Sequence, residues 1–90
     1  MSRVADRLAQ LGISLPQVVT PMASYQPAVR HGGMVFTAGQ LPIRSGAMLA
    51  TGRVGEAVDV ETAAECAKQC ALNAVAALGH VAALDDVAQI

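Results

Sequence analysis

Polar and hydrophobic residues near the start of the chain follow the period of a short amphipathic helix. Val4, Leu8 and Leu11 fall on one stripe of such a helix, and the charged and polar residues around them fall largely on the other. Gly12 follows directly, and glycine is a typical C-terminal stop because it adopts the left-handed conformation without strain. The pattern therefore predicts a helix over residues 2–11.

A longer helical pattern occupies the second half of the chain. From Val60 to about Leu78 the polar residues gather on one stripe, and the remainder is almost entirely Ala, Cys, Val and Leu. Asp59 precedes this stretch, and its carboxylate can cap the free N–H groups of a first helical turn. We expect a helix over about 60–78 whose wide apolar face lies on a sheet. The polar stripe consists of Glu61, Glu65, Lys68, Gln69 and Asn73.

The segment between the two helices predicts an antiparallel hairpin. Two apolar runs flank His31-Gly32-Gly33, and Gly-Gly supplies the positive φ that a tight turn needs. We expect strands at about 25–30 and 34–39, the second of them central in its sheet because it is apolar on both faces. Gly39 at its end indicates a bulge or a close approach of the backbone to another group.

Shorter segments complete the predicted order of elements. Residues 48–50 form a short candidate strand, residues 84–86 predict a turn, and residues 87–90 look like the start of another strand. Strands that precede one long covering helix predict a single α+β domain over residues 1–90, with helices on one face of a sheet.

The composition narrows the class of protein. A chain of 90 residues makes one domain, and 53% hydrophobic against 14% charged residues excludes a disordered, solvated chain. The net charge of −1 gives no footprint for a polyanion, so we expect no nucleic-acid partner. We find no apolar run long enough to cross a membrane and no secretory signal. The apolar excess predicts surface that a partner subunit covers.

The residues alone favour structural roles for most candidate chemical groups. Cys66 and Cys70 lie four apart in the predicted long helix, which is a poor arrangement for a disulfide and lacks the further ligands that zinc needs. We therefore expect reduced cysteines and a cytoplasmic protein. Tyr25 stays open between packing and function. Turn, cap or solvated-surface roles are expected for His31, His80, Asp85, Asp86, Arg30, Arg44 and Arg53.

Several motifs, taken in order, carry a resemblance to a known family. Residues 24–29, Ser-Tyr-Gln-Pro-Ala-Val, precede the glycine hairpin, and residues 35–42, Val-Phe-Thr-Ala-Gly-Gln-Leu-Pro, follow it. Asn73 then lies near the centre of the long helix, and Leu-Asp-Asp-Val occupies residues 84–87. In this order the motifs resemble the reactive intermediate deaminase (RidA) family, also labelled endoribonuclease L-PSP. The resemblance implies a chorismate-mutase-like α+β fold, a homotrimer, and clefts between subunits that bind small carboxylate metabolites.

The resemblance also implies a reaction and two binding residues. The implied reaction is hydrolysis of reactive enamines or imines, such as 2-aminoacrylate, to 2-keto acids and ammonia, without a cofactor or a metal. Tyr25 matches the family's pocket tyrosine, which lines the substrate cleft, and Gly39 matches a glycine whose backbone approaches the ligand. Many members carry serine before that glycine, and Ala38 here removes one hydroxyl. Asn73 matches the helix asparagine, which we interpret as satisfying nearby backbone groups.

One part of the family pattern has no counterpart in this chain. The family arginine grips the substrate carboxylate with two charge-assisted hydrogen bonds, and an acidic residue positions the water. Both would fall beyond Ile90, and no arginine of this chain matches, so no residue is assigned as catalytic. We expect a C-terminally truncated fold and an inactive or impaired chain. The alternatives are a non-catalytic small-molecule-binding or assembly module of the same fold, and an unrelated enzyme that shares the fold.

Overall fold

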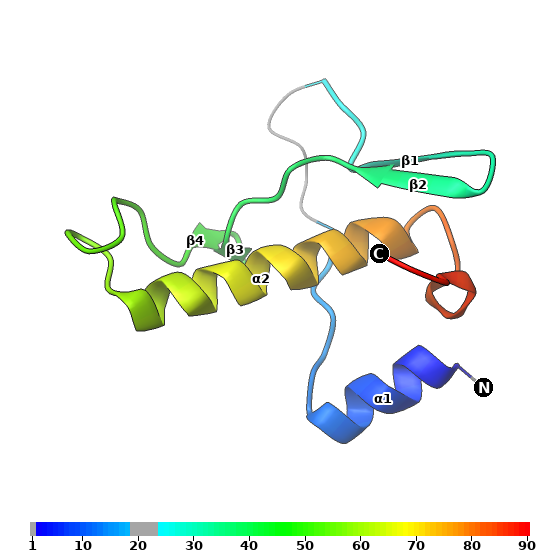
Figure 1. Cartoon of the computed structure of the whole chain (residues 1–90), viewed down its shortest axis with the longest axis horizontal. Helices are drawn as coiled ribbons and strands as arrows, with labels where there is room; N and C mark the ends of the chain where they lie inside the picture. The colour runs from blue at the N-terminus through cyan, green and yellow to red at the C-terminus, as the bar shows by residue number, and fades with distance from the viewer. Residues whose placement is uncertain (1, 19–23) are drawn as a thin grey trace.

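The computed structural model describes residues 2–18 and 24–90, which form two α-helices, two small antiparallel hairpins and a 3₁₀ turn. Helix α1 spans Arg3–Leu11, and the long helix α2 spans Val60–Gly79. The sequence predicts these helices over 2–11 and about 60–78. Figure 1 shows α2 through the middle of the molecule, with the first hairpin on one side of it and α1 on the other. The layout is α+β, as the sequence predicts.

Strands β1 (Ala28–His31) and β2 (Met34–Thr37) form the first hairpin, in the register that pairs Ala28 with Thr37 and His31 with Met34. Gly32 has a φ of 59° and Gly33 has no positive φ, the combination of a type II′ turn. Within the described residues β2 pairs with β1 alone, so the prediction of a central strand over 34–39 is wrong. Apolar residues on both faces of a strand indicate that both faces are covered. They do not indicate how many strands pair with it, because strands pair through the hydrogen bonds at their edges.

The second hairpin joins strands β3 (Ile43–Arg44) and β4 (Ala47–Met48). Its two-residue loop has φ values of 53° at Ser45 and 83° at Gly46, so both residues are left-handed, as a type I′ turn requires. The short strand predicted at 48–50 therefore begins one residue earlier, at Ala47, and ends two residues earlier, at Met48. It gains its pairing from the segment just after Pro42.

Helix α2 begins where the sequence predicts. Asp59 is its N-cap, and the Asp59 Oδ1 accepts a hydrogen bond of 2.7 Å from the Thr62 backbone N–H. Hydrogen bonding from the Thr62 side chain first, and from this backbone N–H second, favours the charged carboxylate and lowers the pKa of Asp59. The helix contacts both β2 and β3, so it covers one side of each hairpin.

The core between α2 and the hairpins is built from small side chains. The buried apolar residues are Ala28 on β1, Ala76 and Ala77 on α2, and Val58 just before α2. Alanine buries little area, so each contact contributes little, and close packing of backbones takes the place of bulky side chains. In a core of this kind, hydrogen bonds between buried polar side chains and the backbone contribute much of the stability that holds the elements together.

The opposite face of the first hairpin is apolar and exposed. Val29 pairs with Phe36, and Met34 pairs with His31 at the next position on the same face. Val29, Met34 and Phe36 are 49%, 61% and 54% exposed, while Ala28 on the α2 side is buried. We call these three residues the open hairpin face. It is part of the uncovered apolar surface that the composition predicts.

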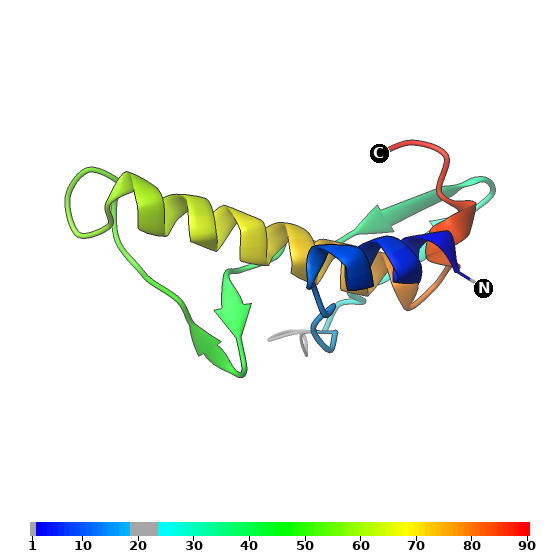
Figure 2. The same ribbon diagram turned by 90° about the horizontal axis from the view of Figure 1, so that it is seen from below.

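Helix α1 is held by the 3₁₀ turn η1 (Leu84–Asp86) (Figure 2). The Ser2 hydroxyl caps the Ala5 N–H at 3.1 Å. The Asp85 carboxylate accepts from the backbone N–H groups of Arg3 at 3.0 Å and Val4 at 2.8 Å. The first backbone N–H groups of a helix have no acceptor within the helix. Three of those in α1 are thereby satisfied, and two of the three bind Asp85, more than eighty residues away in the sequence.

The strand predicted at 87–90 is absent, and these residues are irregular. Val87 N–H donates to the Leu84 carbonyl and closes the 3₁₀ turn, and Ile90 is 99% exposed. A strand needs a partner edge for its hydrogen bonds, and among the described residues neither hairpin lends one to this segment. None of the described helices is long and apolar enough to cross a membrane.

The Asp85 cap predicts an effect that depends on pH. Hydrogen bonding to the Val4 N–H, above all, lowers the pKa of Asp85. A carboxylate with a lowered folded-state pKa stabilises the fold above its ordinary value of about 3.9, and this contribution is lost as the pH falls toward the lowered pKa. Asp85→Asn should therefore reduce helical circular dichroism and thermal stability at neutral pH. The difference from the unchanged chain should shrink in acid.

Asp86→Asn is the matched control, because Asp86 is exposed and forms no side-chain hydrogen bond among the described residues. It should leave helicity and its pH dependence unchanged. Equal effects of the two substitutions would contradict the assignment of the cap to Asp85.

Candidate functional site

Asn73 ties the centre of α2 to the backbone that leads into the second hairpin. Its side chain is fully buried, and its Nδ2 donates to the carbonyls of Leu41 and Ile43, both at 3.0 Å. One amide group thus satisfies two backbone acceptors at the start of β3. The structural role predicted for Asn73 is confirmed.

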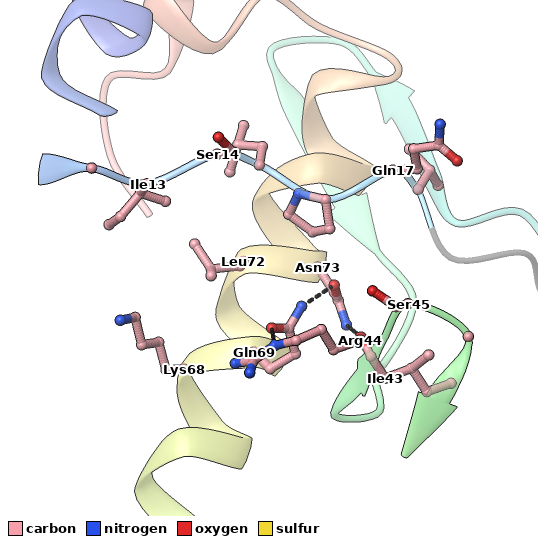
Figure 3. Close-up of a pocket in the computed structure, with 15 residues that line it drawn as sticks. Ile13, Ser14, Gln17, Ile43, Arg44, Ser45, Lys68, Gln69, Leu72 and Asn73 are labelled. Carbon is pink, nitrogen blue, oxygen red and sulfur yellow. Dashed lines mark hydrogen bonds between the residues drawn. The ribbon is translucent and has the colours of Figure 1, made fainter. Parts of the chain in front are cut away.

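The same amide anchors a second side chain. Gln69, one helical turn earlier on α2 and 3% exposed, donates from its Nε2 to the Asn73 Oδ1 at 3.0 Å. Its Oε1 accepts from the Arg44 Nε, also at 3.0 Å. Figure 3 shows Arg44, Gln69 and Asn73 joined in this order. We call the three residues the amide relay.

The amide relay forms one wall of an open cleft of about 940 Å³, which we call the connector cleft. The segment 12–18 lies across it, the loop of the second hairpin forms one rim, and α2 provides the floor (Figure 3). The lining is mixed, with aliphatic side chains from the connector and polar side chains from β3 and α2. Such a cleft can hold a small molecule that has both a polar and an apolar part.

Arg44 is more than the solvated surface charge that the sequence predicts. Its Nε is engaged by Gln69, while its Nη2 lies 3.8 Å from the Glu65 Oε2. The latter distance is a loose ion pair rather than a hydrogen bond, and both side chains are more than half exposed. The guanidinium is therefore fixed at one edge and available at the other.

Tyr25 and Gly39 lie at the open end of the first hairpin. The Ala38 N–H donates to the Pro27 carbonyl at 2.8 Å, which extends the pairing of β1 and β2 by one bond toward both residues. Tyr25 is 46% exposed, and no heavy atom lies within 4 Å of the position that a Cβ on Gly39 would take. The structure thus leaves room beside both residues. Neither of them lines the connector cleft.

The cysteines and histidines form no chemical site in the described parts of the chain. Cys66 and Cys70 are free and half-buried, and burial, followed by the neighbouring Cys66, raises the pKa of the Cys70 thiol. A raised pKa keeps a thiol protonated and unreactive. His31 and His80 are exposed, and no three residues of metal-binding type come together within residues 2–18 and 24–90.

The sequence missed the link from Arg44 to Gln69. A signal for half of it was present: Gln69 and Asn73 lie four residues apart, on one face of a helix whose neighbours are mostly Ala, Cys and Leu. Two amides on such a face need partners. The partner on β3 could not be identified from the chain, because it depends on how the second hairpin is placed.

Comparison with known proteins finds similar chains, among them two crystal structures and one curated protein, and no family model matches. A crystal structure of a "putative endoribonuclease" from Shewanella oneidensis MR-1 is 30% identical with a TM-score of 0.78, covering 84% of this chain and 50% of that one. Atu1372 from Agrobacterium tumefaciens, a protein of unknown function, is 37% identical with a TM-score of 0.68, covering 83% and 43%. Protein TCP17 from Trypanosoma cruzi is 36% identical over 83 residues.

The chain covers only part of each of these proteins. The match to TCP17 takes in 88% of this chain and 52% of that protein, so the chain spans about half its length. The shared fold is an α+β fold of the kind seen in the Shewanella protein. It places the two helices and two hairpins in a known architecture.

The amide relay predicts a large loss of stability when Asn73 is truncated. Asn73→Ala would leave the carbonyls of Leu41 and Ile43 and the Gln69 amide without their partner. Since each buried unsatisfied polar group costs roughly 1–3 kcal/mol, we expect the free energy of unfolding to fall by about 2–4 kcal/mol in a urea titration.

Lys68→Ala is the control on the same helix, because Lys68 is exposed and forms no hydrogen bond among the described residues. It should change the free energy of unfolding by less than about 0.5 kcal/mol. A small effect of Asn73→Ala, similar to the control, would show that the relay does not hold the second hairpin.

Proposed function

We propose that this chain belongs to the endoribonuclease L-PSP-like, or reactive intermediate deaminase, family and forms part of a site that acts on enamines and imines. The observation that carries the proposal is the likeness to the Shewanella protein over most of this chain, in sequence and in fold together. The ordered motifs around Tyr25, Gly39 and Asn73 support the same family. In this family the expected chemistry is deamination of small metabolites.

The proposed reaction is hydrolysis. An enamine such as 2-aminoacrylate gains a proton on its terminal carbon and becomes the imine. Water then adds to the imine carbon, a proton moves to the nitrogen, and the carbon–nitrogen bond breaks. The products are pyruvate and ammonia, so one water is consumed and no electrons are gained or lost. The reaction accordingly needs no redox cofactor.

Tyr25 and the Gly39 backbone are the groups that this chain contributes in the proposal. Within the described residues the Gly39 N–H has no hydrogen-bond partner, and it is free to donate to a substrate carboxylate. The half-exposed Tyr25 provides a ring to line the site and a hydroxyl to hydrogen-bond the ligand or its water. Ala38 leaves the backbone as the donor at a position where many members add a serine hydroxyl.

No residue of this chain is proposed as catalytic. The family's carboxylate-gripping arginine has no match among Arg30, Arg44 and Arg53, because none of them stands at the corresponding position of the sequence. The proposal therefore separates binding from turnover. This chain binds a 2-keto acid weakly, and it does not speed up the hydrolysis of 2-aminoacrylate.

Titration with 2-oxobutyrate, followed by amide chemical shifts, tests the binding. Shifts should centre on Gly39 and Tyr25, and Tyr25→Phe should weaken binding about two- to tenfold through the loss of one hydrogen bond. Ser24→Ala, which removes the neighbouring hydroxyl, should have no effect. An absence of shifts at these residues would overturn the proposed site. Acceleration of pyruvate release from 2-aminoacrylate by the unchanged chain would overturn the requirement for the arginine.

The proposal extends to a homotrimer with ligand sites between subunits. Its support is the open hairpin face, where three large apolar side chains lie exposed beside each other on a sheet. Apolar groups gathered on one face are typical of a surface that a second subunit covers. Tyr25 precedes β1 of the same hairpin, which would bring it toward a subunit boundary.

Light scattering after size-exclusion chromatography tests the assembly. The expected mass is three times that of the 9.2-kDa chain, and Phe36→Glu should reduce it to that of a monomer. Val54→Glu places the same charge on an equally exposed valine in a loop and should leave the trimer intact. A monodisperse monomer for the unchanged chain would count against the assembly, without bearing on ligand binding.

A further inference from the structure

The connector cleft has one aliphatic side and one cationic side, and the proposed function uses neither of them. One side is aliphatic and comes mainly from the connector between α1 and the first hairpin. The other side is cationic, with Arg44 from β3 and Lys68 from α2. The aliphatic side chains are Ile13, Leu15, Pro16, Val18 and Leu72.

Arg44 is oriented for a ligand by the amide relay. Its Nε is held by the buried Gln69, whose own amide is fixed by Asn73. In Figure 3 the Arg44 side chain reaches from β3 across to α2, where Lys68 is anchored. With the Nε edge occupied, the two Nη groups remain as a planar pair of donors. Such a pair matches the two oxygens of a carboxylate.

The charges beside Arg44 leave this pair of donors partly free. Glu65 lies 3.8 Å from the Nη2, too far for a hydrogen bond, and its side chain is 63% exposed. Lys68 forms no ion pair in the part of the chain that the structure describes. The described cleft lining therefore holds two cations and no carboxylate, and an anionic ligand can displace Glu65, which lies beside the lining and is held loosely by Arg44.

We propose that the connector cleft binds a small aliphatic carboxylate. Its carboxylate lies against the Arg44 Nη groups and near the Lys68 ammonium. Its hydrocarbon part lies along the aliphatic side chains of the connector and Leu72. The ligand class follows from the cleft itself: the planar donor pair binds an oxyanion such as a carboxylate. The aliphatic side favours a hydrocarbon chain of a few carbons, which inorganic sulfate and phosphate lack.

Hexanoate is the probe, followed by NMR of the backbone amides, the Gln69 side-chain amide and the Arg44 Nε–H. Shifts should centre on Arg44, Gln69 and Leu72. Hexan-1-ol, with the same chain and no charge, should bind more weakly, and inorganic phosphate, with charge and no chain, should bind more weakly as well. If either hexan-1-ol or phosphate bound as tightly as hexanoate, the assignment of the ligand class would be overturned.

Charge variants on the cleft test which groups bind, and each has a matched control. Lys68→Met should weaken hexanoate about two- to fivefold, and Glu65→Gln should strengthen it by a similar factor, as expected for exposed charges. Arg53→Met and Glu56→Gln make the same charge changes in a solvated loop pair, Arg53 to Glu56 at 3.7 Å, and should leave affinity unchanged. If the cleft and loop variants changed the affinity for hexanoate equally, the net charge of the protein would explain the result, and the proposed site would be overturned.

The location of the shifts keeps this proposal separate from the proposed function. Hexanoate shifts confined to Tyr25 and Gly39 would refute the connector cleft and leave the family site standing. Failure of 2-oxobutyrate to bind at Tyr25 and Gly39 would leave the hexanoate result unaffected. Arg44→Lys supplies a final check, since it retains the charge but loses the planar fork and should bind hexanoate more weakly than the unchanged chain.

Discussion

The hydrogen bonds of Asn73 are the constraint on which the arrangement of this molecule depends. Because the core is made largely of alanine, apolar contacts alone contribute little to the packing of α2 against the hairpins. Asn73 adds the missing stabilisation: it donates two hydrogen bonds to the carbonyls of residues 41 and 43 and accepts one from Gln69. The carbonyls that it binds follow Gly39 by only a few residues. The same side chain therefore positions the second hairpin, orients Arg44, and fixes the exit of the segment that holds the proposed metabolite site.

Two different kinds of recognition then share one helix. In the proposed function, the end of the first hairpin offers a backbone N–H and an aromatic ring to a ligand and carries no cationic side chain for it. The connector cleft offers cations and an aliphatic wall but no family motif. The two regions are linked mechanically through the 39–44 segment, because Asn73 holds its middle and Arg44 its end. Asn73 thus fixes the backbone that joins the two regions.

Much of the architecture could be predicted from local patterns, and the parts that could not are those decided by distant partners. Both helices, the Asp59 cap and the glycine hairpin follow from residues within a few positions of one another. The expected central strand and the strand at 87–90 failed, because apolar residues report burial and not which edge will pair. Arg44 seemed a free surface charge because its acceptor lies 25 residues away. Asp85 was expected in a local turn, whereas it also caps a helix at the other end of the chain.

The cap between Asp85 and α1 has a consequence for the order in which this protein forms during synthesis. Helix α1 has nine residues, and an isolated helix of that length is marginal in water. It is translated well before residue 85, yet two of its opening N–H groups find their acceptor only when residue 85 emerges. Helix α1 therefore becomes stable only after the whole of α2 has been translated. Its docking marks the point at which residues 3–85 have all been made, and a nascent chain that stalls before that point presents a frayed α1 to proteases.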